Sequence, residues 1–123
     1  MTAGLWYVVI VSMVIGAGML GFWSITLAAG RVPEISGGSR EIWFHVAAEV
    51  GTAGMLLSGA VATLADPEAA AGAAVSCLGL GMLLYSITVS PGYYVDRREW
   101  PMVAMLAGVW VLAAPAVVLR APV

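Results

Sequence analysis

Three side chains that can bind a proton or a cation recur at four-residue intervals within one apolar stretch of the chain. They are Glu41, His45 and Glu49. Because residues four positions apart lie on the same side of a helix, the spacing predicts that these side chains share one helical face. Carboxylate and imidazole groups accept and release protons, so this face is the candidate site for proton or cation coupling.

Glu49 is the most informative residue of the three because of its depth in the apolar stretch. It lies seven residues after Ile42, which corresponds to roughly 10 Å along a helix axis. A carboxylate near the centre of a membrane costs about 3 kcal/mol on insertion scales, and such residues are functional by default. We therefore expect Glu49 to be a coupling group. The alternative is that it only forms a hydrogen bond between helices. The hydroxyl groups that could serve as its partners are those of Thr52, Tyr85, Ser86 and Thr88.

Polar side chains near the end of the third apolar stretch are expected on the same side of the membrane as Glu49. If their helical faces converge with that of Glu49, they form a polar vestibule. They are Tyr85, Ser86, Thr88 and Ser90.

The site residues do not form a recognisable metal or cofactor motif. One helix supplies too few ligands for a metal shell, and the chain has a single His, so bis-histidine haem ligation is excluded. There is also no Gly-rich phosphate-binding loop and no nucleophile–base pair. We therefore expect no enzyme activity, no catalytic residues, no metal and no cofactor. The lone Cys77 is expected to be a small buried apolar residue.

The composition identifies the class of protein. Of 123 residues, 62% are hydrophobic and 10% charged, and the mean hydropathy is +0.99. These values are typical of an integral membrane protein. The chain has no Lys and only five Arg, so no basic stripe can follow a phosphate backbone, and nucleic acid is not an expected partner.

Four uncharged stretches are long enough to cross a lipid bilayer, which requires about 20 residues of helix. The sequence predicts an all-α integral membrane protein, a single domain over residues 1–123 with four transmembrane helices in an antiparallel up-down bundle. The helices are expected at residues 5–29, 42–65, 69–89 and 100–119. The first is expected to be retained, because it lacks the positive start of a signal peptide.

The connections are short and contain helix-breaking residues. Residues 30–40 are expected to connect the first two helices without regular structure. Asp66 is expected to cap the third helix, with Pro67 at its first position. The charged and aromatic segment between helices three and four is expected to be an interfacial loop.

Arginines predict the orientation, because short Arg-rich loops remain cytoplasmic. Four of the five arginines lie in the first and third connections, so both termini are expected on the non-cytoplasmic side of a prokaryotic plasma membrane. Trp23 is assigned to an aromatic belt at the membrane–water interface.

Small residues recur at helical spacing in all four stretches, as is typical of membrane helices that pack closely. There are more of these small residues than the helix–helix interfaces inside one four-helix bundle require, so a homo-oligomer or a partner membrane subunit is expected. The residues assigned to helix packing are Gly16, Gly21, Gly51, Gly54, Ser58, Gly81 and Gly108.

Two functional interpretations follow. In the first, the protein is a homo-oligomeric channel or transporter for protons, cations or a small cationic solute, with Glu49 as the coupling group, His45 and Glu41 as a proton relay and Thr52 beside them. In the second, it is a non-catalytic accessory or assembly subunit of a larger membrane complex, and Glu49 pairs with a polar group of the partner.

Overall fold

The computed structural model describes residues 1–121, and all regular structure in that part of the chain is helical. Four helices are long and apolar enough to cross a membrane: α1 (Ala3–Ala28), α3 (Glu41–Ala65), α4 (Ala70–Val89) and α6 (Trp100–Arg120). The third of these candidate spans continues through a short following helix to Asp96. The predicted helical class and the four apolar segments are thereby confirmed.

Two connections contain short helices that the sequence interpretation described as loops. They are α2 (Pro33–Ser36) and α5 (Pro91–Asp96). Each begins with a proline, whose fixed φ angle suits the first position of a helix and whose missing N–H leaves no donor unsatisfied there. The prediction of an unstructured connection at residues 30–40 is therefore wrong for its middle part.

The turn between α3 and α4 also differs from the prediction. Pro67 does not begin a helix, because α4 begins at Ala70 with Ala69 as its N-cap. Asp66 instead ends α3, and its Oδ1 accepts a hydrogen bond from the Glu68 N–H at 3.1 Å. The Asp66 side chain thus stabilises the turn itself rather than the first turn of α4.

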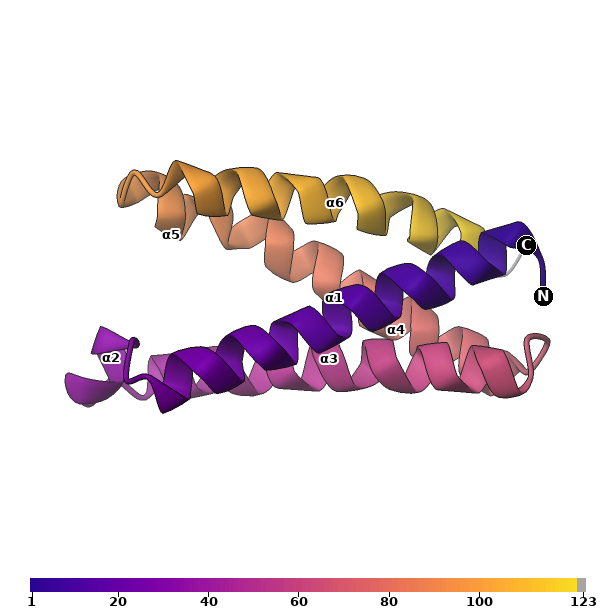
Figure 1. Ribbon diagram of the computed structural model, residues 1–123, viewed down its shortest axis with the longest axis horizontal. Coiled ribbons are helices and arrows are strands. Elements are labelled where there is room, and N and C mark those ends of the chain that lie inside the picture. The colour runs from indigo at the N-terminus through magenta and orange to yellow at the C-terminus, as the bar shows by residue number, and fades with distance from the viewer. Residues whose placement is uncertain (122–123) are drawn as a thin grey trace.

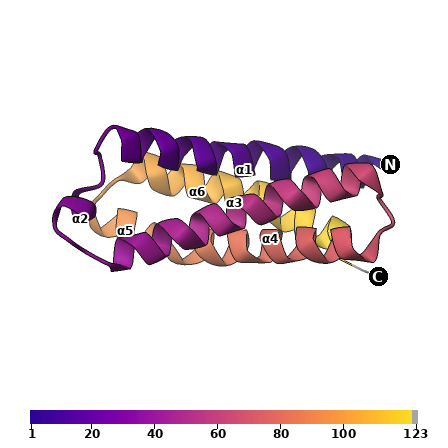
Figure 2. The same cartoon turned by 90° about the horizontal axis from the view of Figure 1, so that it is seen from below.

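The four long helices contact one another in a ring: α1 with α3, α3 with α4, α4 with α6, and α6 with α1. Figures 1 and 2 show α2 and α5 at one end, whereas the beginning of α1 and the end of α6 lie at the other. The main core lies inside the ring and is formed by aliphatic side chains from all four helices. Its members are Val8, Val11, Ile15, Leu56, Leu80, Leu83, Ile87, Ala113 and Ala116.

The glycines assigned to helix packing fall into two groups. Gly16 lies between α1 and α3, where an added Cβ would be 3.0 Å from Leu57 and 3.2 Å from the Ala53 carbonyl oxygen. At the other five glycines, an added Cβ would meet no atom of the described chain within 4 Å, and Ser58 is exposed. The closest helix approach occurs elsewhere, at Gly59 between α3 and α4, where an added Cβ would lie 2.7 Å from Oγ of Ser76.

Candidate functional site

Glu49 contacts polar side chains from three helices. Its Oε2 accepts from the indole Nε1 of Trp23 on α1. Its Oε1 lies 3.5 Å from the Ser86 hydroxyl, which donates from α4, and 3.3 Å from Nε2 of His45 on its own helix. The side chain is 19% exposed. A carboxylate that is largely enclosed, accepts two hydrogen bonds and lies beside an imidazole is positioned to exchange a proton or to bind a cation.

Trp23 is a residue of this candidate site that the sequence interpretation did not include. It was assigned to an interfacial belt, yet it is only 7% exposed and packs with Val32 and Val46 in a second small core. The belt assignment is therefore corrected. A buried indole N–H requires an acceptor, and Glu49 supplies it.

The predicted helical face of α3 is only partly assembled into a site. His45 approaches Glu49 and also packs edge-on against the Trp23 ring, with 5.8 Å between the ring centroids. Glu41 is exposed at the start of α3, and neither a hydrogen bond nor an ion pair joins its side chain to another described residue. Within residues 1–121, no group of three His, Cys, Asp or Glu side chains is close enough to hold a metal ion. The structure therefore places His45, but not Glu41, in contact with Glu49.

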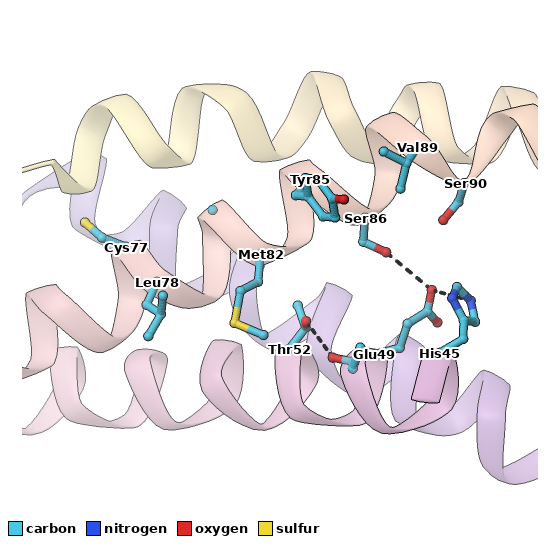
Figure 3. Close-up of a pocket in the computed structure, with 12 residues that line it drawn as sticks. His45, Glu49, Thr52, Cys77, Leu78, Met82, Tyr85, Ser86, Val89 and Ser90 are labelled. Atoms are coloured by element: carbon cyan, nitrogen blue, oxygen red, sulfur yellow. Dashed lines mark hydrogen bonds and ion pairs between the residues drawn. The ribbon is translucent and has the colours of Figure 1, made fainter. Parts of the chain in front are cut away.

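A groove of about 460 Å³ lies between α3 and α4, and Glu49 lies at its polar end. Figure 3 shows Glu49 extending from α3 toward Ser86 on α4, with His45 beside it, while Met82 extends from α4 toward α3. The side chains along the groove are mainly apolar. The lining residues are His45, Ala48, Glu49, Thr52, Cys77, Leu78, Gly81, Met82, Tyr85, Ser86, Val89 and Ser90.

Three of the four residues predicted to form a polar vestibule line this groove: Tyr85, Ser86 and Ser90. Thr88 does not, because it points elsewhere and donates to the Leu84 carbonyl oxygen at 2.6 Å. Thr52 lines the groove, but its hydroxyl donates to the Ala48 carbonyl oxygen at 2.8 Å rather than to Glu49. Of the four hydroxyl groups considered as partners of Glu49, only that of Ser86 contacts it within the described chain.

A second polar contact joins α2 and α5 at the end of the molecule nearer to Glu49. The Tyr93 hydroxyl donates to Oε1 of Glu34, and Nη2 of Arg97 lies 3.9 Å from the same oxygen. The Arg97 guanidinium also lies over the Tyr93 ring at 3.4 Å from its centroid. The hydrogen bond from Tyr93, the backbone of Glu34 itself and the positive charge of Arg97 hold the pKa of the Glu34 carboxyl below its ordinary value of 4.5. This contact, which we name the α2–α5 contact, fastens the two connections to each other.

We expect Glu34→Gln to remove a pH-dependent part of the stability. A lowered pKa in the folded state means that the ionised carboxylate stabilises the fold above the ordinary pKa and that this contribution is lost as the pH falls through the lowered pKa. Because Glu34 is solvent-accessible, the expected loss at neutral pH is at most about 1 kcal/mol. Detergent-induced unfolding of both proteins from about pH 3 to 7 measures it. The difference should be largest at neutral pH and vanish in acid; a difference that grows in acid contradicts the assignment.

Residues 5–121 match the protein family described as "Domain of unknown function (DUF8058)". No curated protein and no solved structure matches the chain.

Proposed function

The chain belongs to the DUF8058 family, and from the geometry around Glu49 we propose that it is a membrane transporter for protons, cations or a small cationic solute. The observation that carries the proposal is the convergence of Trp23, His45 and Ser86 on one largely enclosed carboxylate beside a groove. Trp23 and Ser86 donate to Glu49 from two other helices, so the charge of Glu49 is sensitive to helix arrangement. A change in its protonation therefore changes the contacts that hold α1, α3 and α4 together.

The proposed setting is a bilayer crossed four times. The four long helices support it by length and apolar composition, and their large exposed apolar side chains require a non-aqueous surrounding. We place them as an antiparallel up-down bundle in a prokaryotic plasma membrane. The arginines of the two connections at the α2 and α5 end put that end in the cytoplasm and both termini outside.

A carrier fits the interior better than an open channel. Beside Glu49 the ring is closed by aliphatic side chains that are at most 1% exposed, among them Leu56, Leu80 and Leu83. A continuous water-filled path through such packing requires a rearrangement of the helices. Glu49 would then exchange its proton or cation with one side at a time.

We further propose a homo-oligomer. The outward glycines Gly21 on α1 and Gly108 on α6 leave helix surfaces onto which another helix backbone could pack closely. The mass of the protein in lipid nanodiscs tests this point. A single mass equal to one chain would contradict it.

Flux measurements on the wild-type protein test the transport proposal. Purified protein is reconstituted into liposomes that contain a pH-sensitive dye, and an imposed cation or proton gradient is applied over a range of pH. We expect protein-dependent proton movement with a single pH midpoint. Absence of flux with protons, Na⁺, K⁺ and small organic cations would contradict the proposal and favour an accessory subunit, for which purification with native membrane neighbours is the corresponding experiment.

A further inference from the structure

The α3–α4 groove has a polar end and an apolar end. Glu49, His45 and Ser86 lie at the first, and Leu78 and Met82 line the second. Leu78 and Ser86 are eight residues apart on α4, which corresponds to about 12 Å along the helix axis. A ligand that fills the groove must therefore have a polar group at one end and an apolar body about that long.

The size and lining of the groove suit an organic molecule. Its volume of about 460 Å³ falls within the range of about 300–1,000 Å³ that is typical of small-molecule sites, which are mostly apolar with a few fixed polar groups. Tyr85 is 73% exposed on the same side of α4, so its ring is available to cover part of a bound molecule.

The charge at the polar end selects a cation. Glu49 and His45 carry the ionisable side chains at that end, and no arginine lines the groove within residues 1–121. A metal ion is a poor fit, because it needs several oxygen or nitrogen ligands and no group of three His, Cys, Asp or Glu side chains gathers there within residues 1–121. An alkylammonium group requires no ligand geometry, only a negative charge and apolar or aromatic surroundings.

We propose that the groove binds an amphipathic organic monocation, with its ammonium group at Glu49 and its hydrocarbon part along Leu78 and Met82. This proposal deepens the transport function and rests on it in one respect, since both assign the substrate charge to Glu49. It names the substrate class, which the transport proposal leaves open among protons, inorganic cations and organic cations.

Trp23 provides a direct reporter of binding, because its indole N–H donates to Glu49. The other four tryptophans are exposed and can be replaced by Phe: Trp6, Trp43, Trp100 and Trp110. The full chain in nanodiscs is titrated with octyltrimethylammonium, and Trp23 fluorescence is recorded. We expect a saturable change that tetramethylammonium, which lacks the tail, and octanesulfonate, which has the opposite charge, produce only at much higher concentration. A response to octanesulfonate equal to that to octyltrimethylammonium would overturn the proposal, because it would indicate mere partition of the octyl chain into the bilayer. An equal response to tetramethylammonium would overturn it as well, because the apolar part of the groove would then contribute nothing.

Gly81 allows the groove to be filled without disturbing the bundle. It lines the groove, and an added Cβ there meets no atom of residues 1–121 within 4 Å. Gly81→Leu should therefore weaken octyltrimethylammonium binding by about tenfold or more through loss of space. The matched control is Gly18→Leu on α1, where an added Cβ also meets nothing within 4 Å and which does not line the groove. It should bind as the parent protein does. Unchanged binding in Gly81→Leu would overturn the proposed location.

Failure of this proposal is distinguishable from failure of the transport function. Binding is measured without any gradient, so it is observed even if the protein moves nothing across the bilayer. Conversely, if wild type moves protons but shows no saturable response to octyltrimethylammonium, the organic-cation site is refuted while transport stands. With both proposals correct, Gly81→Leu retains proton flux and loses the organic cation, whereas Glu49→Gln loses both.

Discussion

Glu49→Gln is expected to abolish proton-driven flux in reconstituted liposomes while leaving the protein folded. Gln has almost the same shape as Glu, and its amide oxygen can still accept from Trp23 or Ser86, so the bundle should fold although these contacts lose the strength that the charge gives them. The amide cannot carry a proton or a negative charge at neutral pH. Removal of a proton-transferring group typically slows a reaction by a factor of about 100 or more, and we expect a decrease of that order in the flux.

Glu41→Gln is the matched control for this experiment. Glu41 lies on the same helix and undergoes the same chemical change, but it is exposed and makes no side-chain contact with Glu49 in the described structure. We expect it to change the flux less than about twofold, by altering only the local surface charge. Equal loss in both variants would show that surface charge matters rather than the enclosed carboxylate, and full flux in Glu49→Gln would remove Glu49 from the mechanism.

The central part of this site could be predicted from the sequence because its signal is local. His45 and Glu49 are four residues apart on one helix, so their contact follows from helical periodicity alone. Ser86 could only be proposed together with other hydroxyls, since the relative rotation of α3 and α4 depends on packing that the sequence pattern does not show. For the same reason, Thr88 faced away from the groove, contrary to the prediction.

Trp23 could not be assigned to the site from the sequence, because a tryptophan at its position is compatible with two different environments. A tryptophan near the end of an apolar stretch is typical of an interfacial belt, and it is equally able to donate its indole N–H inside a bundle. What decides between them is the neighbouring chain: Val32, just before α2, and Val46 of α3 pack against Trp23, so the ring is covered. Part of that cover comes from residues 30–40, which the sequence analysis treated as a connection without regular structure.

The glycines assigned to helix packing also show that a sequence pattern does not reveal which helix is the neighbour. A small residue repeated every fourth position marks a helix face on which close approach is allowed, but it does not identify which neighbour uses that face. On α3, Gly51 and Gly54 lie on a face where an added Cβ meets no described atom within 4 Å. Gly59 on the same helix lies against α4. The distinction depends on the crossing point of α3 and α4, which is set by the Asp66 turn and the core side chains together.

The largest effect on stability is expected for Gly59→Ala, at the crossing of α3 and α4. An added Cβ would lie 2.7 Å from Oγ and 2.8 Å from Cα of Ser76, and backbone atoms cannot move aside as a flexible side chain can. The two helices would have to separate. The shift would also disturb Thr63, which donates to the Gly59 carbonyl oxygen at 2.8 Å and lies 3.4 Å from the Ser76 hydroxyl. Overpacking of this kind costs about 1–3 kcal/mol, which we expect as the loss in the free energy of unfolding measured by detergent titration.

Gly54→Ala separates this packing effect from the intrinsic preference of the helix. Gly54 lies on the same helix as Gly59, and a Cβ there meets no described atom within 4 Å. Alanine favours a helix over glycine by up to about 1 kcal/mol, so Gly54→Ala should be neutral or stabilising. Opposite signs for the two variants would establish that α3 and α4 are held in contact at Gly59 by the absence of a side chain. Equal destabilisation would instead mean that the outward face of α3 is also packed, as it would be against a second copy of the chain, and a neutral Gly59→Ala would contradict the close approach itself.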